Sequence, residues 1–318
     1  MSLSKKLKSN LIGKYKKVNS SIFDSVIKLK INEKNQIIQE YNTCLTQNTP
    51  IKIFKMVSII IPCYNVEATL EETITSVVGC GFQNWEAILV NDGSTDNTPK
   101  IIEKWTLKDK RFTVVYQPNA GLGAARNKGL QSASFDYVLP LDADNLLLPG
   151  FIEKALERFR KNNNLAVVYG QAELFGDKSG LWSPGNLEVF RMLNYNYIDA
   201  CSLIKKKCFE KIGGYEENLP HQGHEDWDVW LGFIENGFDF EFLKMPAFKY
   251  RVSGNSMIAG FDEDMKNKNL YFIKNKHKKL YFDNYKNLYF AYVSLRNEKN
   301  SKPFITKFFN RIINKLKS

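Results

Sequence analysis

Between Met56 and about residue 160, short apolar runs alternate with segments whose apolar residues recur at helical spacing. The apolar runs predict four strands, at residues 57–61, 87–90, 112–116 and 137–141. The segments between them predict helices at 67–78, 95–105 and 123–131, and a fourth helix after Pro149-Gly150. The runs are continuous and rich in β-branched residues, as expected for parallel strands buried on both faces. We therefore expect an α/β domain with a largely parallel sheet.

The second half of the chain is less regular. Residues 165–255 mix glycine, proline and aromatic residues, and we interpret them as strands and loops that complete a substrate cleft. From Asp262 onward the pattern is helical. One late helical face gathers the apolar residues Phe304, Ile305, Phe308, Phe309, Ile312, Ile313 and Leu316. Such a face fits either a membrane surface or packing on the domain or on a second subunit, which would make a homo-oligomer.

Charge separates the ends of the chain from its middle. The net charge is +11, but residues 1–55 contain 11 basic and 3 acidic side chains, and residues 262–318 contain 14 and 5. Residues 56–261 are therefore net acidic, which argues against nucleic acid as a partner and for flanks that meet an anionic membrane surface. We predict a basic helical N-terminal extension (1–55), a central domain (56–261) and a basic amphipathic helical C-terminal segment (262–318).

Other compositional features narrow the setting. A chain of 318 residues with 43% hydrophobic residues can bury a full core. Its five cysteines include no Cys-x-x-Cys pair, so we expect a reducing, cytoplasmic setting without a disulfide framework or zinc site. No signal-peptide core follows the N-terminal lysines, and no run approaches the roughly 20 apolar residues that a spanning helix needs. The protein is predicted to be soluble, or peripheral at the inner face of the cell membrane.

Two carboxylates one residue apart follow the fourth predicted strand. Asp142-Ala143-Asp144 stands where the run from Tyr137 to Leu141 gives way to a loop. Mg²⁺ and Mn²⁺ prefer oxygen ligands and share their coordination shell with phosphate, so this spacing suits a cation with a nucleotide diphosphate on its far side. A solvated loop without a ligand is the alternative for an isolated Asp-x-Asp. Ligands of parallel sheets bind at the carboxyl ends of the strands, where this loop is predicted to lie.

Two other strand ends carry candidate contacts. Asp92, after the second strand, can accept a hydrogen bond from a base or a ribose hydroxyl. The alternative is a turn or helix-cap role, which is the favoured interpretation of Asp96. Tyr64, after the first strand, can lie along a base or be a core aromatic residue.

A glycine-containing segment, Asn119 to Asn127, follows the third strand. Its glycines let the backbone approach a ligand, and Arg126 can reach a phosphate or an acidic partner. The segment does not match Gly-x-Gly-x-x-Gly, so a nicotinamide cofactor is excluded. Later, residues 223–228 place three carboxylates beside an imidazole. One interpretation is that these carboxylates form the solvated acidic start of a helix. The nearby Trp227 and Trp230 favour the alternative, a partly desolvated cleft in which a carboxylate acts as a general base.

Together these segments resemble the family 2 glycosyltransferases with the GT-A fold, over about residues 56–255. The motifs are Val57–Asn65, Asn91–Asp96, Gly121-x-x-x-Ala-Arg-Asn127, Asp142-Ala-Asp144 and Glu225-Asp226. The resemblance implies a Rossmann-like, mostly parallel sheet flanked by helices, here with helical extensions at both ends. It also implies an inverting enzyme that moves a sugar from a UDP-sugar to an acceptor hydroxyl, in the synthesis of surface polysaccharide or lipid-linked glycan.

The resemblance also assigns roles to individual residues. It implies a nucleotide-binding set made of Pro62, Tyr64, Asn65, Asp92, Arg126, Asp142 and Ala143. Asp144, with Asp142, would ligate a Mn²⁺ or Mg²⁺ ion that bridges the diphosphate, and Asp226 resembles the catalytic base.

The chain departs from the family pattern at one place. Many relatives have a histidine in a Tyr-Arg-x-His stretch near the diphosphate, whereas here the stretch ends in Ser253, and neither His221 nor His224 can be given that role from sequence. The Gln-x-x-Arg-Trp motif of processive synthases is absent, which implies single or limited sugar addition. A non-catalytic sugar- or membrane-binding module that retains the fold is the alternative function.

Overall fold

The computed structural model describes residues 56–254 and 260–297, all within one compact unit, Lys55–Ser318. The strands are β1 (Val57–Cys63), β2 (Trp85–Asp92), β3 (Phe112–Gln117), β4 (Tyr137–Pro140), β5 (Leu146–Leu147), β6 (Leu165–Gly176), β7 (Gly180–Trp182), β8 (Leu203–Lys205) and β9 (Asp239–Val252). The helices are α3 (Leu70–Val78), α4 (Thr98–Lys108), α5 (Leu122–Ser132), α6 (Phe151–Lys161), α7 (Val189–Asn194), α8 (Lys206–Ile212), α9 (Glu225–Glu235), α10 (Glu263–Lys276) and α11 (Lys278–Asn297).

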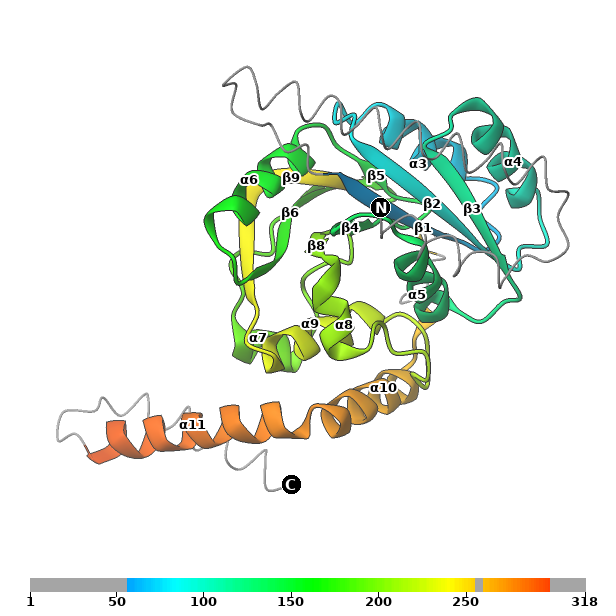
Figure 1. The fold of residues 1–318 in the computed structure, drawn as a ribbon. Helices are drawn as coiled ribbons and strands as arrows, with labels where there is room; N and C mark the ends of the chain where they lie inside the picture. Colours follow the sequence, from blue (N-terminus) through cyan, green and yellow to red (C-terminus); the bar gives the residue numbers. More distant parts are fainter. Residues whose placement is uncertain (1–55, 255–259, 298–318) are drawn as a thin grey trace, which may run out of the picture. The chain divides into compact units, whose positions relative to one another are not determined.

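One mixed sheet organises these elements (Figure 1). Its strand order is β3-β2-β1-β4-β8-β6-β9-β5, and β7 pairs with β6. β1 pairs in parallel with both β2 and β4, and β2 with β3. β8 joins this parallel half to β6 through two antiparallel pairings, and β6 runs parallel to β9. Because β1 lies between β2 and β4, the carboxyl ends of these three strands meet at one edge of the sheet.

Both faces of the central parallel strands β1 and β2 are buried. Along β1, Ile59 and Ile61 belong to one apolar cluster and Ile60 to the other, because successive side chains point to opposite faces. The first cluster includes residues of α3, α4 and α6, and the second includes residues of α5, α8 and α9. Figure 1 shows α3 and α4 on one side of β1 to β3 and α5 on the other. This double burial explains why the strand sequences are continuous apolar runs.

The structure confirms the four strands and four helices predicted in the first half of the domain, with small shifts at their ends. It corrects the interpretation of residues 165–255 as strands and loops, since α7, α8 and α9 lie there as well. α7 and α8 have only six and seven residues, too few to show a helical period. α9 buries eight of its eleven residues, so it lacks the continuous polar face that makes an amphipathic helix recognisable.

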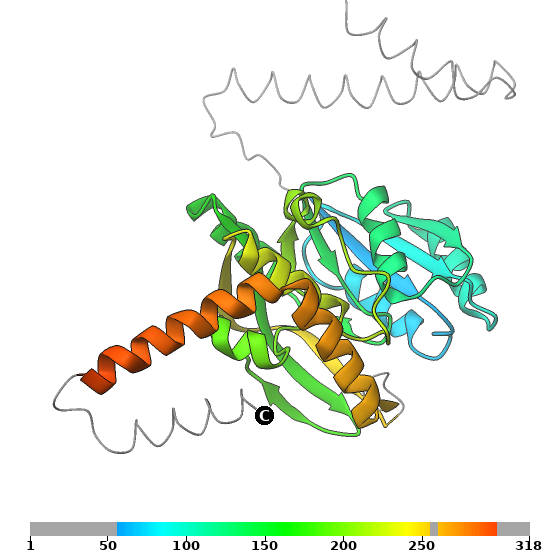
Figure 2. The same cartoon turned by 90° about the horizontal axis from the view of Figure 1, so that it is seen from below.

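The predicted helical character after Asp262 is confirmed for α10 and α11, which follow one another as a bent arm (Figure 2). The apolar face predicted at residues 304–316 and the N-terminal extension lie outside the described residues. Within the described part of the chain, no helix is long and apolar enough to span a membrane. The division into three parts stays a prediction.

The packing of α5 on β1 leaves no room for a side chain at Gly129, so we expect Gly129→Ala to destabilise the protein. A Cβ there would lie 2.2 Å from Cγ2 of the buried Ile60. In an open helix the same change gains up to about 1 kcal/mol, whereas overpacking here should cost about 1–3 kcal/mol, measurable by urea unfolding. In an Ile60→Ala background the cost should nearly vanish. An equal cost in both backgrounds would show that this contact is not the cause.

Candidate active site

The loops after β1 and β2 are fastened to each other at the edge of the sheet. The Asn65 N–H donates to Ser94 Oγ at 3.1 Å, and Asn65 Oδ1 accepts from the Thr95 N–H at 2.8 Å. Asn65 has a φ of 51°, a left-handed conformation that asparagine adopts more readily than most residues. The adjacent Tyr64 is 50% exposed, so the core alternative for this residue is wrong and its ring is accessible to a ligand. Pro62 is buried within β1, opposite Val90.

Asp92, at the end of β2, organises the loop that follows β3. Its Oδ1 accepts from Gln117 Nε2 at 2.7 Å and from the Ala120 N–H at 2.8 Å, and its Oδ2 accepts from the Gly121 N–H at 2.9 Å. Three donors therefore hold a carboxylate that is only 3% exposed. Asp96 precedes the N-cap residue Asn97 of α4 and accepts from the Thr98 N–H at 2.9 Å, which fits a turn role just before this helix.

The loop before α5 also contacts the segment before α9. Gln222 Oε1 accepts from the Leu122 N–H at 2.8 Å. Gly121 has a φ of +93°, and a Cβ there would lie 2.5 Å from Gln222 Nε2, so this approach requires glycine. Asn127 bonds both backbone groups of Tyr215, donating to its carbonyl at 2.9 Å and accepting from its N–H at 2.7 Å. These contacts join the glycine-containing loop and α5 to the α8–α9 connection.

Arg126 is a buried cation whose partner is Asp142. The guanidinium is 4% exposed as a side chain, and its Nη2 lies 2.6 Å from Asp142 Oδ1. Burial by itself would lower the pKa of Arg126, but the charges of Asp142, Tyr215, Glu225 and Asp226 raise it above the ordinary value. Its Nε has no hydrogen-bond partner among the described residues. Arg126 therefore lies between the acidic loop after β4 and the start of α9.

Asp144 is a half-buried carboxylate beside a second acid. Burial and the charge of Asp142 raise its pKa to about 6, whereas Arg251 acts in the opposite direction. Arg251 comes from β9; its Nε donates to the carbonyl of Asp144 at 3.0 Å and its backbone N–H donates to Asn145 Oδ1 at 3.0 Å. The carbonyl of Ala143 accepts from Thr69 Oγ1 at 2.8 Å. The acidic loop is thus held from α3 and from β9.

The acidic loop suits a hard divalent cation. Two neighbouring carboxylates offer oxygen ligands, and the raised pKa of Asp144 shows that its negative charge lacks full compensation in the protein. The described residues contain no cluster of three or more His, Cys, Asp or Glu side chains arranged for a metal.

The three carboxylates at the start of α9 have different surroundings. Glu225 is 2% exposed, and its two oxygens accept from the Gly223 N–H at 2.9 Å. Asp228 is also 2% exposed and lies 2.9 Å from His277 Nε2 and 2.8 Å from Lys276 Nζ, both at the α10–α11 junction. The solvated alternative is therefore wrong for both residues. Asp226, between them, instead accepts hydrogen bonds from Asn196 and from the Trp227 N–H.

Asp226 faces Asn196 and lies within the field of Arg126. Its Oδ2 accepts from Asn196 Nδ2 at 2.8 Å. Burial and the charge of Glu225 raise the pKa of Asp226 to about 7, although Arg126 and Asn196 favour the ionised form. A carboxyl whose pKa lies near neutrality is suited to general base catalysis. The structure thus brings Asp226, Arg126 and Asp142 into one electrostatic group.

Sequence reasoning missed three members of this group. Asn196 lies in the connection between α7 and β8, and its Oδ1 accepts from the Ile198 N–H at 3.2 Å, which orients its amide toward Asp226. Asp199 belongs to the same group, because burial, then the charges of Asp142 and Asp226, raise its pKa. Burial and the charges of four aspartates raise the pKa of Tyr250 to about 12. The aspartates are Asp199, Asp142, Asp144 and Asp226.

The two histidines near α9 contact α10 and its neighbour Phe261. His224 Nδ1 lies 3.0 Å from Asn269 Nδ2, and the rings of both His221 and His224 pack against Phe261. Burial lowers the pKa of His224. These contacts join the segment before α9 to α10. Ser253 lies just before residues 255–259, which are outside the described range.

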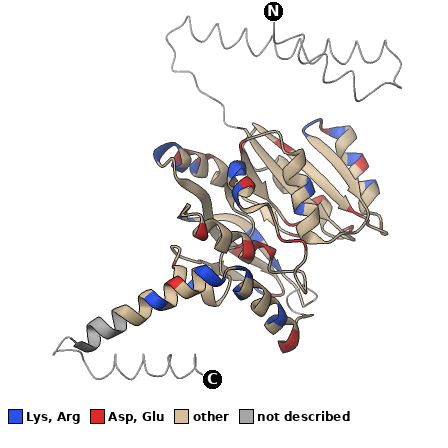
Figure 3. Ribbon diagram, turned by 60° about the horizontal axis from the view of Figure 1, so that its bottom comes forward, with Lys and Arg blue, Asp and Glu red and all other residues tan. Residues whose placement is uncertain are grey.

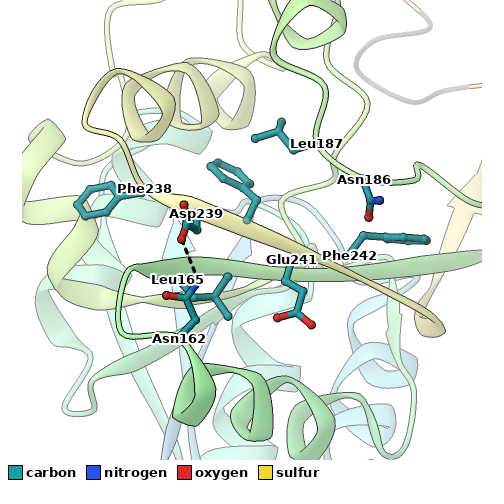
Figure 4. Close-up of a pocket in the computed structure, with 9 residues that line it drawn as sticks. Asn162, Leu165, Asn186, Leu187, Phe238, Asp239, Glu241 and Phe242 are labelled. Atoms are coloured by element: carbon teal, nitrogen blue, oxygen red, sulfur yellow. Dashed lines mark hydrogen bonds between the residues drawn. The ribbon is translucent and has the colours of Figure 1, made fainter.

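The hollow in Figure 4 contains none of the candidate site residues. It has a volume of about 450 Å³ and lies along the first half of β9, where Asp239 bonds Asn162 at 2.9 Å. Phe242 and Asn186 also line it. The candidate active site is instead defined by the convergence of the β1, β2 and β4 ends with α9.

Comparison with known proteins identifies the family. The model of glycosyl transferase family 2 matches residues 58–215. An uncharacterized glycosyltransferase of Haemophilus influenzae is 41% identical over 185 residues, which cover 57% of this chain and 72% of that protein. The putative glycosyltransferase EpsH of Bacillus subtilis is 27% identical over 66% of this chain, which spans only 64% of its length. The putative teichuronic acid biosynthesis glycosyltransferase TuaG of Bacillus subtilis is 29% identical over 64% of this chain and 81% of its own.

Solved structures with a similar fold include two glycosyltransferase complexes. S. aureus TarS 1–349 with UDP-GlcNAc has a TM-score of 0.57 at 19% identity, over 67% of this chain and 64% of that chain. The mannosyltransferase PcManGT from Pyrobaculum calidifontis, with GDP-Man and Mn²⁺, has a TM-score of 0.55 at 16% identity, over 80% and 74%. The structure has the GT-A fold. The chain belongs to the family 2 glycosyltransferases.

Proposed function

We propose that the protein is an inverting glycosyltransferase that moves a sugar from a UDP-sugar to an acceptor hydroxyl. The observation that carries this proposal is the meeting of two acid sites around Arg126, which pairs with Asp142 at 2.6 Å and interacts with Asp226 on α9. The site at Asp142 is suited to a diphosphate, and the site at Asp226 is suited to general base catalysis. The UDP-GlcNAc complex of TarS supports a uridine nucleotide as the donor.

The nucleotide would lie at the ends of β1, β2 and β4. Exposed Tyr64 offers a ring face for the base, and Asp92 fixes the loop that borders it. Asn65 joins the β1 and β2 loops beneath this position. The diphosphate would lie toward Asp142 and Asp144. The carboxylates, with the donor phosphates, would hold Mn²⁺ or Mg²⁺, and the presence of Mn²⁺ in the PcManGT complex supports such an ion.

In the proposed transfer, Asp226 takes the proton of the acceptor hydroxyl. The hydroxyl oxygen attacks the anomeric carbon from the face opposite the diphosphate, and the bond from that carbon to the diphosphate breaks. The electron pair of the broken bond leaves with UDP, and the proton stays on the Asp226 carboxyl. A positioned base of this kind contributes about 10²–10⁴ in rate. A bound divalent cation would supply electrostatic stabilisation of the leaving diphosphate.

Asn196 is proposed as a positioning residue for the base. Its amide donates to Asp226 Oδ2 at 2.8 Å and thereby favours the ionised carboxylate. The Trp227 N–H donates to the other oxygen at 2.8 Å, so both oxygens have a donor. An acceptor hydroxyl would approach a carboxylate whose orientation is already fixed.

The acceptor is proposed to be a surface polysaccharide or a lipid-linked glycan. The enzyme itself is proposed to act in the cytoplasm. The name of the relative TuaG, which refers to teichuronic acid biosynthesis, supports a polymeric acceptor. The acceptor is proposed to lie near the aromatic pair Trp182 and Tyr250, whose ring centroids are 5.9 Å apart. Tyr250 also interacts with the four aspartates of the site.

Asp226→Asn should reduce kcat by about 10²–10⁴ because it removes the proposed proton acceptor. UDP affinity, measured by isothermal titration calorimetry, should stay within about twofold, since the residue is not placed at the nucleotide. Asp136→Asn, at an exposed carboxylate, is the matched control and should keep normal turnover. Near-normal turnover of Asp226→Asn would remove Asp226 from the mechanism.

Asp144→Ala should weaken UDP binding in the presence of Mn²⁺ by about 10–100-fold, as expected for loss of a metal ligand. In EDTA the variant and the unmodified protein should bind UDP with similar, weak affinity. Titration calorimetry in both buffers measures the difference, and Asp136→Ala serves as the control. If Mn²⁺ strengthened UDP binding equally in the variant and the unmodified protein, the metal role of Asp144 would be wrong.

Asn196→Ala should raise the apparent pKa of kcat because it removes a donor to the Asp226 carboxylate. The base is active when ionised, so with a pKa of about 7 the unmodified kcat should rise through neutral pH and level off above it. The variant should lose most activity at pH 6–7 and recover at pH 8–9. Asn194→Ala, at the exposed end of α7, is the control. A pH-independent loss of kcat would indicate a structural role only.

A further inference from the structure

Helix α11 is anchored to the domain by one side. Tyr281 is 6% exposed, and its hydroxyl donates to the carbonyl of Leu193 in α7 at 2.7 Å. The ring of Tyr285, one turn later, packs edge-on against Phe190 with centroids 6.3 Å apart. At the start of the helix, His277 bonds both Asp228 and Glu235 of α9 at 2.9 Å. The orientation of α11 on the domain is therefore fixed.

Another side of α11 exposes large aromatic residues. Phe282, Tyr289 and Phe290 are 66%, 55% and 56% exposed. With the exposed Lys286 they occupy positions i, i+4, i+7 and i+8, which share one helical face. We call these four residues the outer face of α11. Three aromatic rings exposed on one helix are more than scattered surface apolar residues explain, so this face needs a partner.

Charge indicates what that partner is. From Met265 to Asn297 the sequence contains eight Lys or Arg residues and one acidic residue, Asp283. Lys278 and Lys279 are exposed at the start of α11, and Figure 3 shows basic residues along both α10 and α11. Aromatic residues flanked by lysines suit the boundary of an anionic bilayer, where rings enter the headgroup region and lysines meet lipid phosphates.

We propose that the outer face of α11 docks on an anionic lipid surface. A second copy of the chain would bring the same lysines to a symmetric interface, where like charges repel. The chain's own residues 299–318 contain six Lys or Arg and no acidic residue, so their charge does not complement the lysines of this face. An anionic bilayer is the occupant that complements both the aromatic rings and the positive charge.

This docking has a structural consequence for the proposed reaction. α11 continues from α10, and the junction at His277 is bonded to Asp228, two residues after Asp226. A bilayer bound to α11 would therefore stand at a fixed orientation to the helix that carries the proposed base. The docking itself does not rest on the proposed function, because it can be measured without a sugar donor or acceptor.

Co-sedimentation of the full chain with vesicles tests the proposal. Binding is expected to vesicles of phosphatidylcholine with 30% phosphatidylglycerol, to be weak on phosphatidylcholine alone, and to fall as salt is raised. The triple variant Phe282→Ser, Tyr289→Ser, Phe290→Ser should weaken binding at least about tenfold. The matched control is Leu107→Ser, Tyr116→Ser, Leu181→Ser, at residues that are 69%, 59% and 55% exposed elsewhere.

A charge variant tests the electrostatic part. Lys278→Glu, Lys279→Glu, Lys286→Glu should weaken vesicle binding by more than about tenfold, at roughly 1 kcal/mol for each lysine near the surface. The control Lys110→Glu, Lys128→Glu, Lys211→Glu changes net charge equally at exposed sites outside α10 and α11.

Three results would overturn the proposal. In the first, the aromatic triple variant binds vesicles as the unmodified protein does, whereas deletion of residues 302–318 abolishes binding. That result would assign vesicle binding to the C-terminal residues alone. The second is a dimer by light scattering that the aromatic variant converts to a monomer, without vesicle binding. The third is equal loss in the variant and its matched control. Circular dichroism melting of each variant shows whether it is folded.

Discussion

A buried positive charge holds the two halves of the candidate site together. Arg126 comes from α5, pairs with Asp142 of the β4 loop, and interacts with Glu225 and Asp226 of α9. Without this guanidinium, the acids of the loop and of the helix would repel each other across a poorly solvated space. Its burial makes the loss of either partner costly, since a buried charge would be left unpaired. The charge balance among Asp142, Glu225 and Asp226 therefore depends on this cation.

The base-bearing helix is fixed by a second set of polar contacts. Asp228 bonds His277 and Lys276, and Glu235 bonds the other nitrogen of His277, so α9 is clamped to the α10–α11 junction at two points. Burial would lower the pKa of His277, but the two carboxylates raise it above its ordinary value. α9 therefore presents Asp226 from a rigid support, with one face toward Arg126 and the other held by the C-terminal helices.

The sequence was sufficient for the parts of the site that lie at strand ends. Continuous apolar runs identified β1, β2 and β4, and the rules of parallel sheets then placed Tyr64, Asp92 and Asp142 at one edge. It was insufficient where contacts cross irregular chain. Asn196 reaches Asp226 over 30 residues through a connection with no periodic signal. Many relatives have a histidine at the position of Ser253. In this chain, the residue of the same stretch that contacts the acidic loop is Arg251.

The long pairing of β6 with β9 constrains the order in which the domain can fold during its synthesis. β9 supplies Arg251, which bonds Asn145 across 106 residues, and it also pairs with β5, next to the acidic loop. A ribosome would have released the nucleotide-facing half of the domain well before these partners emerge. During that interval the edge of β6 has no parallel neighbour, and contacts of such sequence separation form slowly. The contacts of the acidic loop with Arg251 can therefore form only after residue 251 has left the ribosome.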